Sequence, residues 1–165
     1  MITPEYVQMM ARYNAWQNRN LYEAADTLDE AARQKDRGAF FGSIHGTLSH
    51  LLWGDTIWMS RFDGWENPSS DIFKSPDFSG EWEPLVAKRR EADDRIMSWS
   101  GRVTADDISG DLCWFSDAAK REVCKPRALL IAHIFNHQTH HRGQVHAMLT
   151  AAGAKPDDTD LPFMD

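Results

Sequence analysis

The sequence predicts an all-α protein, a four-helix bundle with one long crossover connection. Two observations support this class, and a third bears on the number of domains. Four long segments place apolar side chains at three- and four-residue spacing, the period of an amphipathic helix. One connection between them is long and rich in glycine, proline and serine. The 165 residues are 42% hydrophobic and 26% charged, so we expect a single domain over residues 1–165.

The first helix starts at residues 3–5, which are threonine, proline and glutamate. Threonine is a good N-cap, proline suits the first helical position, and an acid in the first turn complements the helix dipole. Apolar residues recur at helical spacing from Val7 to Leu28. The pattern therefore predicts a helix that continues to about residues 28–32, before a polar loop over residues 33–38.

The second and third helices are predicted over residues 43–62 and 81–100, where apolar residues again recur at helical spacing. Between them, residues 63–80 contain two prolines and two glycines, which marks this segment as the long crossover.

The segment before the last helix has a different pattern. Residues 108–125 contain two short apolar runs around a polar turn, which predicts a small hairpin. Proline then opens a fourth helix over residues 126–152. The polar tail that follows carries Leu161 and Phe163, which could dock it back onto the helices.

The charge balance excludes some classes of partner. The chain has 18 basic and 25 acidic residues, so 18 − 25 gives a net charge of −7. A protein that binds the nucleic-acid backbone needs a clustered positive face, so we expect no nucleic-acid partner. No apolar run approaches the ~20 residues of a membrane span, and no signal peptide is visible. These features predict a cytoplasmic protein with no membrane partner.

The two cysteines, Cys113 and Cys124, form no CxxC motif, which disfavours a zinc ribbon or a thioredoxin-type site. In a reducing cytoplasm, the expected state is two free thiols.

Histidines are concentrated in the fourth helix, which holds five of the seven. His133, His137 and His141 follow one another at four-residue spacing and so form a stripe on one helix face. Two imidazoles at positions i and i+4 can reach one divalent metal ion. His137 and His141 are the best pair because apolar residues extend the same face. His50 on the second helix is the candidate third ligand from the facing helix.

An alternative interpretation needs no metal. A single HxxxH pair is a weak motif, because helix histidines are often surface residues or core residues that hydrogen-bond to a neighbour. The HExxH pattern of zinc proteases is absent. The spacing alone leaves both interpretations open.

Three segments, however, resemble the DinB family of damage-inducible, metal-binding four-helix bundles. They are residues 13–18 (YNAWQN), 47–55 (TLSHLLWGD) and 136–145 (NHQTHHRGQV), and Asp160-Leu161-Pro162 near the end is also typical. The resemblance covers nearly the whole chain, and it implies a DinB/YfiT-like fold. It also implies a homodimer and a divalent metal ion, often nickel or zinc, held by His50, His137 and His141.

A three-histidine site would leave at least one coordination position open, which is typical of catalytic metal sites. The understood relatives use a low-molecular-weight thiol, so the resemblance suggests a metal-dependent thiol S-transferase with a small-molecule substrate. The sequence itself identifies neither a thiol pocket nor a catalytic residue. Two alternatives remain. One is a metal-dependent hydrolase, and the other is a non-catalytic metal- or ligand-binding stress protein.

Other polar residues near these motifs have candidate supporting roles. Four amides could orient the metal-binding imidazoles: Asn14, Gln17, Asn136 and Gln144. Arg142 could bind a carboxylate substrate, but we favour a structural ion pair with an acid across the bundle. His133 is expected at the rim of the site rather than as a fourth ligand. His140 flanks the site, and His45 is expected to point elsewhere.

Overall fold

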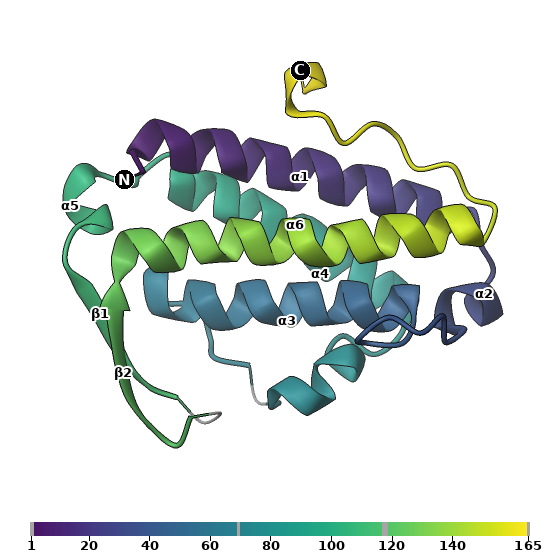
Figure 1. The fold of residues 1–165 in the computed structure, drawn as a ribbon, viewed down its shortest axis with the longest axis horizontal. Coiled ribbons are helices and arrows are strands. Elements are labelled where there is room, and N and C mark those ends of the chain that lie inside the picture. Colours follow the sequence, from purple (N-terminus) through teal and green to yellow (C-terminus); the bar gives the residue numbers. More distant parts are fainter. Residues whose placement is uncertain (1, 69, 117–118, 165) are drawn as a thin grey trace.

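The computed structural model describes residues 2–68, 70–116 and 119–164 of the chain, and this part is mostly helical (Figure 1). The long helices are α1 (Pro4–Asp26), α3 (Ile44–Phe62), α4 (Trp82–Ser100) and α6 (Arg127–Ala151). The short elements are the helices α2 (Glu30–Gln34) and α5 (Ala105–Ile108), the 3-10 helices η1 (Ile72–Asp77) and η2 (Leu161–Phe163), and the strands β1 (Asp111–Ser116) and β2 (Arg121–Pro126).

The four long helices pack against one another (Figure 1). α1 and α3 each contact both α4 and α6. Helices α3 and α6 run antiparallel, since His50 lies beside His141 whereas Trp58 lies beside His133. The candidate site lies between these two helices. No described helix combines the length and apolar character needed to cross a membrane.

The long helices combine strong N-caps with apolar faces. The Thr3 and Ser43 side chains cap α1 and α3 by accepting hydrogen bonds from backbone amides of the first turn. The buried apolar side chains form one core, to which each long helix contributes, among them Val7, Leu48, Leu85 and Ile131. The helices predicted over residues 43–62, 81–100 and 126–152 begin and end within one residue of the observed α3, α4 and α6.

The first helix is shorter than the sequence predicts. It ends at Asp26, and the Thr27 hydroxyl donates to the carbonyl of Ala24. Asp29 then caps the separate helix α2. The predicted continuation to residues 28–32 is therefore wrong, because these side-chain hydrogen bonds redirect the backbone although apolar spacing continues.

The predicted hairpin is present as the antiparallel pair of β1 and β2. Its turn residues 117–118 lie outside the described residues. Cys113 stands directly opposite Cys124 in the register, with Cα atoms 4.1 Å apart, and the two form a disulfide. The expectation of two free thiols is therefore wrong. The pairing of the two strands brings the cysteines together, and their separation in the sequence does not by itself predict that contact.

The C-terminal tail returns along α1, but not through its apolar residues. Tyr13 and Gln17 donate hydrogen bonds to the backbone carbonyls of residues 159 and 158. Leu161 and Phe163 remain 37% and 63% exposed. The tail is thus held by polar side chains of α1, and neither apolar residue belongs to the buried core.

Candidate metal centre

Three histidine side chains meet between α3 and α6. One ring nitrogen from each of His50, His137 and His141 lies within 4.8 Å of the other two. The Nε2 atoms of His50 and His137 are 3.2 Å apart. His50 and His141 are buried and His137 is half-buried. Because imidazole nitrogens bind divalent zinc at ~2.0–2.1 Å, the group could hold one ion after small rotations of the rings.

The close approach of His137 to α3 depends on a glycine. A Cβ atom added at Gly54 would lie 3.2 Å from Cε1 of His137 and 3.6 Å from its Nδ1. Gly54 is one helical turn after His50, so the missing side chain leaves room for the His137 ring beside the His50 ring.

A serine fixes the tautomer of His50. The Nδ1 atom of His50 lies 2.8 Å from the Ser75 hydroxyl oxygen, and this hydroxyl donates to the carbonyl of Ile72 at 2.6 Å. Since the hydroxyl proton is already used, Ser75 accepts a hydrogen bond from Nδ1–H of His50. The Nε2 atom of His50 then carries the free lone pair, and it lies beside Nε2 of His137.

A glutamine orients His141 in the same way. The Nδ1 atom of His141 lies 2.8 Å from Oε1 of Gln144. An amide oxygen can only accept, so Nδ1–H of His141 donates and Nε2 is left as the acceptor. Hydrogen bonds of this kind typically fix metal-binding imidazoles.

Burial keeps the three rings neutral. It lowers the pKa of His50 to about 3, and His137 and His141 contribute in the same direction. Burial likewise lowers the pKa of His137 to about 3, and repulsion from the protonated forms of His141, His133 and His140 would act in the same direction. The pKa of His141 is also lowered by burial, although its bond to Gln144 acts in the opposite direction. Neutral imidazole is the form that binds metal ions.

Aromatic rings cover one side of the cluster. Phe41 stacks on His50 at a centroid distance of 3.7 Å and lies 5.3 Å from His141. Trp53 lies on α3 with its ring 5.8 Å from that of His50. These rings exclude water from part of the site, which raises the strength of any charge interaction there.

Comparisons with known proteins show the family of the chain. The model of the DinB family matches residues 1–165 of the chain. The chain belongs to the DinB family. A relative from Bacillus subtilis (strain 168), Protein DinB, is 23% identical over 170 residues, which cover 94% of this chain and 91% of the relative. Metal binding is general in the DinB family, and the buried histidine group of this member could hold a metal ion.

Of the four amides considered as orienting groups in this DinB-family chain, Gln144 bonds to a histidine of the group. Asn14 instead accepts from Arg142, Gln17 holds the tail, and Asn136 donates to a carbonyl of its own helix. Sequence reasoning missed Ser75. It lies 25 residues after His50 in the irregular crossover, and a segment without periodic spacing gives no prediction of which residue it contacts.

Arg142 has the structural role that we favoured from the sequence, although its partner differs. The side chain is buried, donates to Asn14 and Thr139, and lies over the ring of Tyr13 at 5.4 Å. The expected acid across the bundle is replaced by an amide, so the guanidinium joins α6 to α1.

The remaining histidines lie outside the group. His45 is buried and donates to the carbonyl of Gly80, so it points elsewhere as expected. His133 lies at the rim, 5.7 Å from His137 between ring centroids. His140 is exposed beside His141.

A second group with metal-binding side chains is Cys113, Glu122 and Cys124 on the hairpin. All three are exposed, and both sulfur atoms are already joined in the disulfide. Thiolate is the form of cysteine that binds metals, so this group is not a metal site in the oxidised protein.

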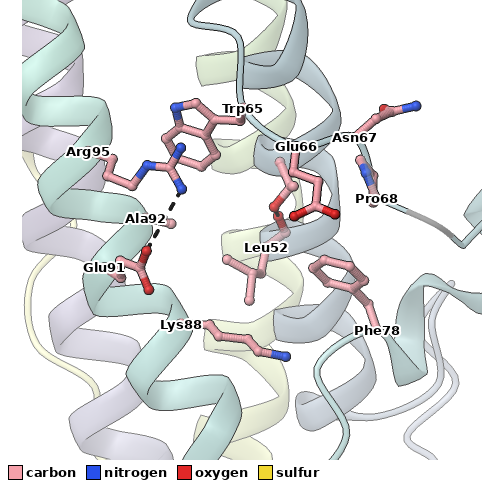
Figure 2. Close-up of a pocket in the computed structure, with 11 residues that line it drawn as sticks. Leu52, Trp65, Glu66, Asn67, Pro68, Phe78, Lys88, Glu91, Ala92 and Arg95 are labelled. Atoms are coloured by element: carbon pink, nitrogen blue, oxygen red, sulfur yellow. Dashed lines mark hydrogen bonds and ion pairs between the residues drawn. The ribbon is translucent and has the colours of Figure 1, made fainter.

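Figure 2 shows a pocket on another face of the molecule, between α3, α4 and the start of the crossover. Its volume is about 380 Å³, and Trp65 and Phe78 supply apolar walls. Arg95 stacks on Trp65 at 3.8 Å and pairs with Glu91 at 3.8 Å. None of the three histidines of the candidate centre lines this pocket.

Proposed function

We propose that this DinB-family protein is a metal-dependent enzyme in which His50, His137 and His141 bind one divalent ion, nickel or zinc, within a single-domain four-helix bundle. The observation that carries the proposal is the orientation of the imidazoles. Ser75 and Gln144 accept hydrogen bonds from the Nδ1–H groups of His50 and His141, which leaves the Nε2 lone pairs for one shared ion.

The leading activity is transfer to or from a low-molecular-weight thiol. A divalent ion with three neutral ligands and an open position lowers the pKa of a bound thiol or water. The protein's own residues prepare this position, since Ser75 and Gln144 orient two ligands and Phe41 shields one side from water. Both cysteines of the chain are in the hairpin disulfide, so the thiol must come from a separate small molecule.

Two other functions make different demands on the site. A metal-dependent hydrolase needs a general base near the open position, but no Asp or Glu belongs to the described histidine group. A non-catalytic protein needs the metal only to join α3 to α6. Removing the ion would then lower stability without any loss of turnover.

The first experiment is elemental analysis of protein purified without a histidine tag. We expect about one nickel or zinc ion per chain, and each of His50→Ala, His137→Ala and His141→Ala should lower this strongly. His146→Ala is the matched control, because His146 is on α6 but outside the group. An unchanged metal content in all three variants would show that the ligand assignment is wrong.

The second experiment tests the thiol. Cobalt-loaded protein should develop a sulfur-to-cobalt absorption band when mercaptoethanol is added, and it should consume thiol in the presence of chlorodinitrobenzene. Metal binding without any thiol band or turnover would favour the non-catalytic alternative. We also propose the homodimer that the family resemblance implies, and sedimentation of the same sample tests it.

A further inference from the structure

The face of α3 that carries His50 continues to a cation at the end of the helix. Gly54 and Trp58 follow His50 at four-residue intervals, and Arg61 lies three helical turns beyond it. Opposite them on α6, His137 lies beside Gly54, and the His133 ring meets the Trp58 ring edge-on, at a centroid distance of 5.3 Å. A row of ring contacts therefore runs from the candidate metal centre to Arg61, about 16 Å away along the helix axis: His137 to His133, His133 to Trp58, and Trp58 to Arg61.

Two tryptophans hold the Arg61 guanidinium. Its central carbon lies 4.7 Å from the centroid of Trp58 on α3 and 5.2 Å from that of Trp114 on β1. The two indoles contact each other at 5.6 Å. A guanidinium stacked on aromatic rings keeps its N–H donors free at its edge, so the stacking positions Arg61 without using its hydrogen-bonding capacity.

No carboxylate neutralises Arg61 within the described part of the chain. Arg33, Arg89 and Arg102 each form an ion pair there, whereas Arg61 forms neither an ion pair nor a hydrogen bond. Burial without a partner lowers the pKa of Arg61. The group thus bears a desolvation cost that an anion at its edge would offset.

The hairpin adds positive charge on the same side. Residues directly opposite in an antiparallel pair share a face, so Trp114 shares its face with Val123, Arg121 and Lys125. Glu122 is paired with Phe115 and belongs to the other, exposed face together with the disulfide. The hairpin face that meets Arg61 therefore carries two more cations and no acid among its described residues.

We propose that Arg61, held by Trp58 and Trp114, binds the anionic end of an elongated small molecule whose other end reaches the metal. The inference rests on the proposed function and gives its substrate class: a thiol that carries a carboxylate or similar anion at its far end. Trp58 and His133 provide the surface on which the middle of such a molecule lies.

The first test uses the metal-free protein and hexanoate, so that it does not depend on metal chemistry. In a nitrogen-15 NMR titration, hexanoate should shift the Nε–H signal of Arg61 and the indole signals of Trp58 and Trp114. Arg61→Gln should abolish the indole shifts, and Arg61→Lys should weaken them. Arg95→Gln is the matched control, because Arg95 is also stacked on a tryptophan but lines the separate pocket.

The second test uses cobalt-loaded protein and pairs of thiols that differ only at the far end. Mercaptoundecanoate should bind about 10–150-fold more tightly than mercaptoundecanol, since a charge-assisted contact contributes roughly 1.5–3 kcal/mol. The advantage should vanish in Arg61→Gln and persist in Arg95→Gln. Mercaptoacetate is too short to reach Arg61, so its affinity should be equal in all three proteins.

The outcomes separate the two proposals. Hexanoate shifts that depend on Arg61, together with no thiol band for any probe, would support the anion site and contradict the thiol function. Thiol bands with no advantage for the long carboxylate would overturn the Arg61 inference and leave the thiol function standing. Hexanoate shifts that are equal in wild type and Arg61→Gln would also overturn it.

Discussion

The Nδ1–H group of His50 donates a hydrogen bond to the hydroxyl of Ser75 at 2.8 Å, and this bond connects the candidate metal centre to the crossover. Ser75 is completely buried in η1, and Ser49, the residue before His50, donates to its backbone carbonyl. An irregular segment therefore sets the direction in which a helix histidine presents its free nitrogen.

The change Ser75→Ala tests this relationship. Without the hydroxyl, the His50 ring loses its fixed tautomer, and we expect metal affinity to fall by about 10–100-fold with the helical content unchanged. Competition with a fluorescent chelator measures the affinity. Ser109→Ala is a suitable control because Ser109 is exposed and bonds only within its own turn. Equal affinities in the two variants would show that the hydrogen bond does not support the site.

The change Gly54→Ala tests the close approach of His137 to α3. The new methyl group would lie 3.2 Å from Cε1 of His137, so the ring must shift by a few tenths of an ångström. Ligand distances tolerate only about 0.2 Å, and we therefore expect metal affinity to fall about tenfold or more. In Gly143→Ala in α6, the new carbon has no heavy atom within 4 Å beyond its chain neighbours and the backbone of its own helix. This control should keep its affinity and gain up to about 1 kcal/mol of stability. Unchanged affinity in Gly54→Ala would contradict the packing argument.

Arg89 and Asp55 form a buried ion pair, and removing one partner should destabilise the core strongly. Arg89 Nη1 lies 2.7 Å from Asp55 Oδ2, and both side chains are at most 3% exposed. Arg89 also pairs with Asp93 at 2.9 Å, so replacing Arg89 with methionine leaves two carboxylates uncompensated, and we expect a loss of about 3–5 kcal/mol in the free energy of unfolding. Urea denaturation measures this. The triple variant Arg89→Met, Asp55→Leu, Asp93→Asn removes both carboxylates and should recover much of the loss, and a triple variant no more stable than the single one would contradict this explanation.

The hairpin disulfide gives a prediction about thiols. Titration of the unreduced, unfolded protein should detect no free thiol, and reduction should release both Cys113 and Cys124. Cys113→Ser with Cys124→Ser should speed amide exchange in β1 and β2, because an isolated two-stranded hairpin is marginally stable. The helices α3 and α6 should keep their exchange rates. Two free thiols before reduction would show that the bond does not form in solution.

Sequence spacing predicted the helices and the histidine group for a simple reason. The α-helical period places residues at i and i+4 on one face, so His137 and His141 lie together wherever α6 forms. The same period made the first helix appear too long, because apolar spacing continues past Asp26 while the side chains of Thr27 and Asp29 end one helix and start another. Local hydrogen bonds outweighed the pattern there.

The sequence by itself thus determined the four long helices, the hairpin, the histidine-bearing faces and resemblance to the DinB family. Only the tertiary structure decided that Ser75 meets His50, that Arg142 meets Asn14, and that Arg61 is held between Trp58 and Trp114. The physical reason is the distance along the chain over which each kind of interaction acts. Helical periodicity acts over a few residues, whereas these contacts join elements whose relative position is set by packing of the whole core.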